Sequence, residues 1–84
     1  MTRDEVRNRL VILVHEIAKV PTDQITESAT LDDQIQLESV AFVELQVAIE
    51  EDFDILIDPI QVVELNEFGA IVDYVHDCTT RPKT

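Results

Sequence analysis

Apolar residues recur every three or four positions near the start of the chain, the spacing that places side chains on one face of an α-helix. These positions are Val6, Leu10, Leu13, Val14 and Ile17. Thr2, with Glu5 three residues later, fits a capping box, which satisfies the unpaired amides where a helix begins. The helix should stop near Lys19, because Val20 precedes Pro21 and a residue before proline is steered away from helical dihedral angles.

The next segment, from Pro21 to about Glu38, is polar and rich in turn-forming residues, so the pattern predicts a long loop. Three isolated apolar residues interrupt this segment: Ile25, Leu31 and Ile35. A structureless loop of this length is uncommon in a compact domain. We therefore expect an ordered loop that these three side chains attach to the core.

Residues Ser39 to Phe53 carry two apolar stripes on one predicted helix. The first stripe, expected to face the core, consists of Phe42, Leu45, Ile49 and Phe53. The second lies on the opposite side and consists of Val40, Val43 and Val47, with Glu44 and Glu51 beside it. Burial of both stripes would be usual for a bundle helix. Glutamates are costly to bury without basic partners, so we expect an exposed stripe rimmed by acids, typical of a helix that docks a partner.

The last part of the chain predicts a short helix and a longer one. Asp58 followed by Pro59 is typical of an N-cap and a first helical residue, and this helix should run to about Glu64. The final helix is expected to begin with Asn66 as its cap. Its buried side is predicted to consist of Phe68, Ile71, Val72 and Val75.

The remaining apolar run, residues 55–57, has no second strand with which to pair, so we expect a connector that packs inward. The predicted fold is therefore all-α: a small four-helix bundle of three main helices and one short helix, with a long first loop. We expect one domain over residues 1–78 and a frayed tail over residues 79–84.

The charge of the chain excludes some classes of partner. The 84 residues contain 18 Asp and Glu against 6 Lys and Arg, which gives a net charge of −12. Binding to the phosphate backbone of nucleic acid is therefore excluded, while the 45% hydrophobic content argues against disorder. The basic residues all lie near the two ends of the chain: Arg3, Arg7, Arg9, Lys19, Arg81 and Lys83. We therefore expect surface ion pairs to do little for the acidic middle of the chain.

The sequence gives no sign of secretion or of a membrane-spanning segment. Cys78 is the single cysteine, so it can form no internal disulfide, and we expect it to be a packing residue. Charged residues interrupt any apolar run in the first thirty residues, and no stretch is long enough to span a bilayer. We expect a cytoplasmic protein without a membrane partner.

Metal and catalytic sites are not expected. The acidic run over residues 52–58 suggests a calcium loop, but Ile57 stands where that loop needs glycine and Val63 where it needs a bidentate acid. His15 and His76 lie on different predicted helices, with no Cys or His at ligand spacing. An enzyme needs a nucleophile, a base and an orienting group in a pocket, for which this chain has little room.

Ser39, at the start of the two-faced helix, allows two interpretations. Serine is a common N-cap, and most serines at such positions have no other role. A helix N-terminus also stabilises negative charge, so a phosphate ester on Ser39 would be favourable there. Composition and periodicity leave both interpretations open.

The residues around Ser39 carry a family resemblance. The segment from Ile35 to Val40 reads Ile-Gln-Leu-Glu-Ser-Val and is followed by Val-Glu-Leu over residues 43–45 and by an acidic run that ends at Phe53. The match continues to the final helix without a gap. The chain in this respect resembles acyl carrier proteins, small acidic helical proteins that bear 4'-phosphopantetheine on a serine. It departs from their pattern at the site itself, with Glu38 for Asp, Val40 for Leu and Gln36 for Gly.

The resemblance implies a function and a set of site residues. A phosphopantetheinyl transferase would move 4'-phosphopantetheine from coenzyme A to Ser39, making a phosphoprotein whose arm carries acyl groups as thioesters in fatty-acid, polyketide or peptide-type biosynthesis. The protein would be a monomer without catalytic residues, serving acyl-loading and chain-processing enzymes that have basic patches. The partner-facing residues that the resemblance implies are Glu38, Val40, Val43, Glu44, Val47, Ala48 and Glu51. The alternative is an unmodified acidic adaptor of the same fold that binds basic partner proteins.

Overall fold

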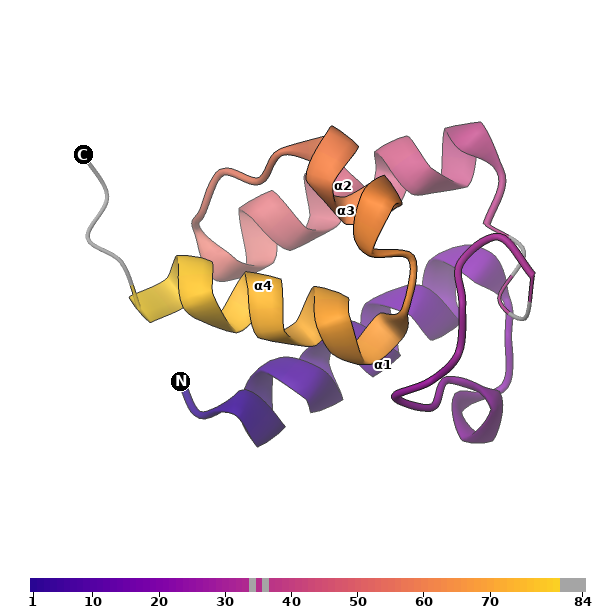
Figure 1. Ribbon diagram of the computed structural model, residues 1–84, viewed down its shortest axis with the longest axis horizontal. Helices are drawn as coiled ribbons and strands as arrows, with labels where there is room; N and C mark the ends of the chain where they lie inside the picture. Colours follow the sequence, from indigo (N-terminus) through magenta and orange to yellow (C-terminus); the bar gives the residue numbers. More distant parts are fainter. Residues whose placement is uncertain (34, 36, 81–84) are drawn as a thin grey trace.

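The structure, a computed structural model, describes residues 1–33, 35 and 37–80. Its elements are α1 (Arg3–Ala18), the short 3-10 helix η1 (Thr22–Gln24), α2 (Ser39–Phe53), α3 (Pro59–Leu65) and α4 (Phe68–Thr80) (Figure 1). The β-type pairing among the described residues is one isolated bridge between Thr30 and Glu67. The prediction of an all-α bundle with three main helices and one short helix is confirmed.

The helix start signals in the sequence act as expected at α1 and α3. The Thr2 hydroxyl accepts from the Glu5 N–H at 3.2 Å, and the Glu5 carboxylate accepts from the Thr2 N–H at 2.8 Å, which completes the capping box. At α3 the Asp58 carboxylate caps the helix by accepting from the Ile60 N–H at 3.0 Å, with proline in the first helical turn. α1 ends at Lys19, whose backbone is left-handed with φ 62°.

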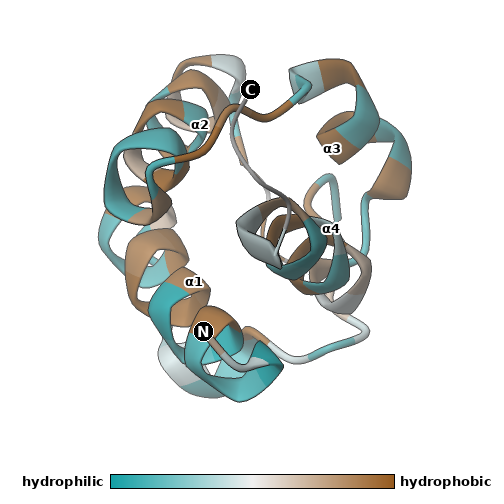
Figure 2. Ribbon diagram, turned by 90° about the vertical axis from the view of Figure 1, so that its left-hand side faces the viewer, coloured by the Kyte–Doolittle hydropathy of each residue, from teal (hydrophilic) through white to brown (hydrophobic). Residues whose placement is uncertain are grey.

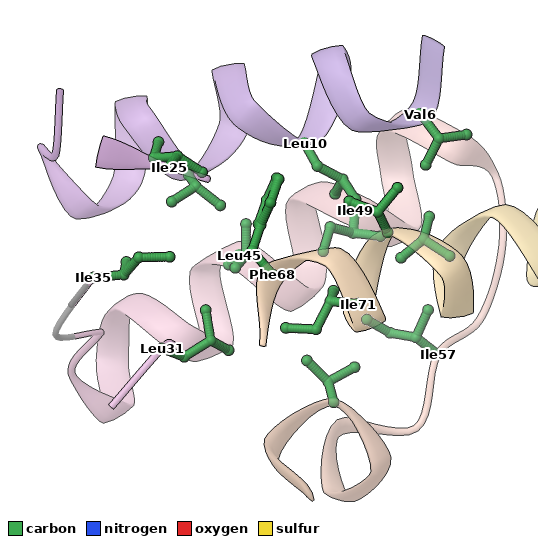
Figure 3. Packing of buried hydrophobic residues seen from close by; sticks show 14 of the residues in the cluster. Val6, Leu10, Ile25, Leu31, Ile35, Leu45, Ile49, Ile57, Phe68 and Ile71 are labelled. Atoms are coloured by element: carbon green, nitrogen blue, oxygen red, sulfur yellow. The ribbon is translucent and has the colours of Figure 1, made fainter. Parts of the chain in front are cut away.

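The core lies between the helices and under the first loop, and it is formed by the predicted stripes (Figure 3). The side chains buried there from the helices are Val6, Leu10, Val14, Leu45, Ile49, Val62, Phe68, Ile71, Val72 and Val75. Figure 2 shows α1 and α2 on one side of the bundle, with α4 across from them and α3 next to α4. Cys78 is partly buried against this core, as expected of a packing residue.

The first loop is ordered, and the three apolar side chains that were expected to attach it to the core are buried. Ile25, Leu31 and Ile35 are 4%, 6% and 2% exposed. Backbone hydrogen bonds also join the loop to the start of α4: the Phe68 N–H donates to Ala29 O and the Gly69 N–H donates to Glu27 O, both at 2.8 Å. A Cβ on Gly69 would lie 2.9 Å from Glu27 O. This close backbone approach explains the one glycine of the chain.

The prediction that Asn66 caps the last helix is wrong. Asn66 is the C-cap of α3, with φ 60°, and α4 begins at Phe68. Its side chain binds the first loop, because Nδ2 donates to Asp32 Oδ1 at 3.1 Å and Oδ1 accepts from the Asp32 N–H at 3.3 Å. Asparagine tolerates positive φ as well as serving as an N-cap, so it can end one helix as readily as begin the next.

Two other segments differ from expectation. The connector packs inward through Ile55 and Ile57, but Leu56 between them is 79% exposed, because successive side chains of an extended segment face opposite sides. α4 continues to Thr80, two residues into the expected tail. Gln36, Arg81 and Lys83 lie outside the described residues.

Ion pairs reach the acidic middle of the chain, contrary to expectation. The Arg3 guanidinium lies 2.7 Å from Glu27 Oε1 and 2.5 Å from Asp73 Oδ1. Arg9 binds both carboxylate oxygens of Asp52, at 2.5 and 2.6 Å. The acids are remote from these arginines in sequence, and only the packing of α1 against the loop, α4 and α2 brings them together.

The pair between Arg9 and Asp52 predicts a specific pH dependence. The hydrogen bonds from Arg9 lower the pKa of the Asp52 carboxyl, so the pair stabilises the fold at pH 7 and is lost as pH falls through the lowered folded pKa. Arg9→Gln should therefore lower the thermal midpoint at pH 7, and the difference from wild type should shrink below about pH 4. Circular dichroism melts across pH measure the effect. In an Asp52→Asn background the arginine substitution should have no such pH-dependent effect, and persistence there would contradict this explanation.

Candidate functional site

Ser39 is the first residue of α2, and its side chain is exposed. The N-cap is Glu38, with an extended backbone at φ −72° and ψ 162° and no side-chain cap hydrogen bond. The structure thus decides against the interpretation of Ser39 as the N-cap. Among the described residues, its hydroxyl has no hydrogen-bond partner, so the oxygen is available for chemistry.

The loop before Ser39 holds the start of α2 in place. The Ile35 N–H donates to Thr30 O at 2.9 Å, and the Leu37 N–H donates to Leu31 O at 2.8 Å. The Phe42 N–H then donates to Glu38 O at 2.7 Å and begins the helical pattern. The first turn of α2 contains no acidic residue, so the unpaired amides there favour an anionic group on Ser39.

A cavity of about 310 Å³ opens beside Ser39. Its lining comes from the first loop, α2, α3 and the C-cap of α3: Leu31, Asp32, Leu37, Ser39, Phe42, Val43, Val63 and Asn66. The sequence predicts that Ser39 and the α2 residues lie on one helix, but it does not predict that the first loop and α3 form the other walls of the cavity. On the α3 side of the cavity Val63 faces outward, whereas Val62 next to it is buried.

The second stripe of α2 faces solvent. Val40, Val43 and Val47 are 71%, 55% and 46% exposed. Glu38, Glu44 and Glu51 are exposed beside them, and Ala48 is half-buried. The prediction of an exposed stripe, rather than a helix sandwiched within the bundle, is confirmed. We call these residues the α2 face.

The α2 face keeps its negative charge. The described basic side chains that form ion pairs are Arg3 and Arg9, and neither binds Glu38, Glu44 or Glu51. The predicted α2 face thus presents aliphatic side chains with unneutralised carboxylates around them. Such a surface complements basic residues arranged around an apolar patch.

The described part of the chain shows neither a cluster of three or more metal-ligating side chains nor a helix long and apolar enough to cross a bilayer. His15 lies at the surface, with Nδ1 2.7 Å from Val20 O. Neither His15 nor His76 is among the residues that line the cavity beside Ser39.

Comparison with known families shows to which family the chain belongs. A family model described as a phosphopantetheine attachment site matches residues 8–75, which include Ser39 and the α2 face. The "Acyl carrier protein" of Acidothermus cellulolyticus is 29% identical over 79 residues, covering 94% of each chain. The chain belongs to the acyl carrier protein family. Its role is that of a carrier, with 4'-phosphopantetheine as the prosthetic group.

Other acyl carrier proteins match over similar lengths. The "Acyl carrier protein" of Saccharopolyspora erythraea is 27% identical over 84 residues, covering all of this chain and 88% of its own. The "Acyl carrier protein, mitochondrial" of Saccharomyces cerevisiae is 33% identical over 79 residues, covering 89% of this chain and 63% of the yeast protein. These matches support the role of the chain as a carrier.

Proposed function

We propose that Ser39 is the residue to which 4'-phosphopantetheine is esterified, and that the chain carries acyl intermediates of fatty-acid, polyketide or peptide-type biosynthesis. The observation that carries this proposal is the exposed hydroxyl of Ser39, unpartnered among the described residues, at the N-terminus of α2 and within the matched range. Ser28 is the other serine of the chain and lies in a turn of the first loop beside the start of α4, rather than in the first turn of a helix.

The surroundings of Ser39 fit the group. The phosphate would lie against the unpaired amides of the first turn of α2, and the apolar walls of the adjacent cavity suit the less polar part of an arm or its cargo. When bound, the group supplies a mobile thiol that holds acyl groups as thioesters. The chain contributes the attachment oxygen, a positive helix end and an apolar recess, and it acts as a tether rather than a catalyst.

Intact mass spectrometry tests the proposal. The purified chain is incubated with coenzyme A, magnesium and several phosphopantetheinyl transferases, and we expect it to gain the mass of one phosphopantetheinyl group. A folded chain that no transferase modifies would contradict the proposal and favour the unmodified acidic adaptor.

We further propose that the α2 face docks the enzymes that act on the arm, through weak and salt-sensitive contacts with their basic residues. Replacing Glu44 and Glu51 by Lys should lower kcat/KM for modification by a transferase roughly tenfold, while the helical spectrum stays unchanged. Glu16→Lys with Asp23→Lys is the matched control, since both residues are exposed acids outside α2. An equal loss in the control would mean that net charge alone matters, and loss of the fold in the α2 variant would mean that the glutamates support the bundle.

A further inference from the structure

Asn66 ends α3 in a backbone conformation that few residues adopt. Its φ is 60° and its ψ is −38°, and the Glu67 N–H donates to Leu65 O at 2.6 Å across it. This geometry is close to the rare and strained type of γ-turn, in which the central residue has positive φ. Strain of this kind persists where surrounding contacts impose it, and it is common at functional sites. The contacts of Asn66 therefore indicate what the strained turn supports.

Asn66 holds the first loop through hydrogen bonds from both its backbone and its side chain. Its backbone O accepts from the Leu31 N–H at 2.9 Å. Its side chain binds Asp32 in both directions, because Nδ2 donates to Asp32 Oδ1 at 3.1 Å and Oδ1 accepts from the Asp32 N–H at 3.3 Å. The turn after α3 and the first loop therefore lie side by side (Figure 1).

Leu31 connects this contact to the residues that precede Ser39. The Leu37 N–H donates to Leu31 O at 2.8 Å, and α2 begins shortly after Leu37, at Ser39. All of these residues line the one cavity beside the hydroxyl: Leu31, Asp32, Leu37, Ser39 and Asn66. A continuous path of hydrogen bonds and backbone thus runs from the end of α3, through the first loop, to the start of α2.

We propose that Asn66 is a positioning residue for Ser39, because it fixes the part of the first loop that determines where the start of α2 lies. The role rests on the proposed function and adds to it a residue outside α2. Group transfer needs the attacking oxygen in a defined place, and a misplacement of about 1 Å can cost about a hundredfold in rate. The α2 face stays in place when Asn66 is changed, so the loss should fall on kcat rather than on KM.

Asn66→Asp tests this role with little change of shape. Aspartate also adopts positive φ, so the turn gains no new strain, but two carboxylates would then face each other at positions 32 and 66. For modification by a phosphopantetheinyl transferase with coenzyme A, we expect kcat to fall about tenfold and KM for the chain to stay within about twofold of wild type. Adding Asp32→Asn should restore kcat, because an amide and a carboxylate again face each other.

Amide hydrogen exchange gives a readout that does not depend on the transferase. In Asn66→Asp the Leu37 N–H should exchange about tenfold faster, because Leu31, which provides its acceptor, is held less firmly. The Gly69 N–H donates to Glu27 O at 2.8 Å, at another part of the same loop, and its exchange should not change. The two amides distinguish a local effect beside Ser39 from loosening of the whole loop.

Asn8→Asp is the matched control, because Asn8 is an exposed residue of α1 and the substitution adds the same charge. It should behave as wild type in both measurements. Circular dichroism establishes the fold of each variant. If Asn66→Asp unfolds, Asn66→Gly takes its place, because glycine adopts positive φ without strain and lacks the side chain that binds Asp32. We expect the same direction of change in kcat and in exchange.

The outcomes separate this role from the function on which it rests. A wild-type chain that is not modified overturns the proposed function and the role of Asn66 with it. When the wild-type chain is modified, an unchanged kcat for the folded Asn66 variant overturns the role of Asn66 alone. The same holds for a loss confined to KM, a loss that Asp32→Asn does not restore, a loss that Asn8→Asp reproduces, or equal acceleration of exchange at Leu37 and Gly69.

Discussion

The Leu10→Ala chain is expected to lose about 2–5 kcal/mol of its free energy of unfolding. Leu10 is 1% exposed and belongs to the buried cluster that α1 shares with α2, α4 and the first loop. Removing its side chain leaves a cavity that its packed neighbours can fill only in part. Natural domains have about 5–15 kcal/mol in all, and small ones lie near the lower end, so this variant should be close to unfolding. Urea denaturation followed by circular dichroism measures the loss.

Leu56→Ala is the matched control, because the same side chain is 79% exposed at that position. Its free energy of unfolding should stay within about 0.5 kcal/mol of wild type. Similar losses at the two positions would mean that the packing described for α1 does not hold the bundle together.

Ser39→Ala is expected to abolish modification by every phosphopantetheinyl transferase that modifies the wild-type chain. The substitution removes the oxygen that would be esterified, so no alternative geometry at that residue restores the reaction. Stability should change by no more than about 0.5 kcal/mol, because the Ser39 side chain is exposed and has no partner among the described residues. Intact mass spectrometry over time measures the modification.

Ser28→Ala provides the control for this experiment, since Ser28 is the other exposed serine of the chain. Its rate of modification should equal that of wild type. Modification of Ser39→Ala at a comparable rate would place the attachment site elsewhere.

The helices could be predicted from sequence because their signals are local. The capping box at Thr2, the Asp58–Pro59 pair and the apolar stripes each depend on residues within a few turns of one another. Asn66 was assigned to the wrong helix because the same residue type can end a helix or begin one. The structure resolves this ambiguity through the contact of Asn66 with Asp32, which lies far away in sequence.

Part of the candidate site could be predicted because its signals also come from residues that lie close together in sequence. The exposure of the α2 face followed from glutamates without basic neighbours, and the solvent-facing Val40, Val43 and Val47 confirm that argument. The walls of the cavity could not be predicted, because they depend on how the loop and α3 pack beside α2. The ion pair between Arg9 and Asp52 could not be predicted either, because it depends on how α1 packs against α2, which no local pattern in the sequence indicates.

The measurement that tests the central claim most directly is tandem mass spectrometry of the transferase-modified chain after proteolysis. The account predicts that the phosphopantetheinyl ester lies on Ser39, in a peptide that contains the start of α2. An ester on Ser28 or on a threonine, or a folded chain that carries none after treatment, would contradict it.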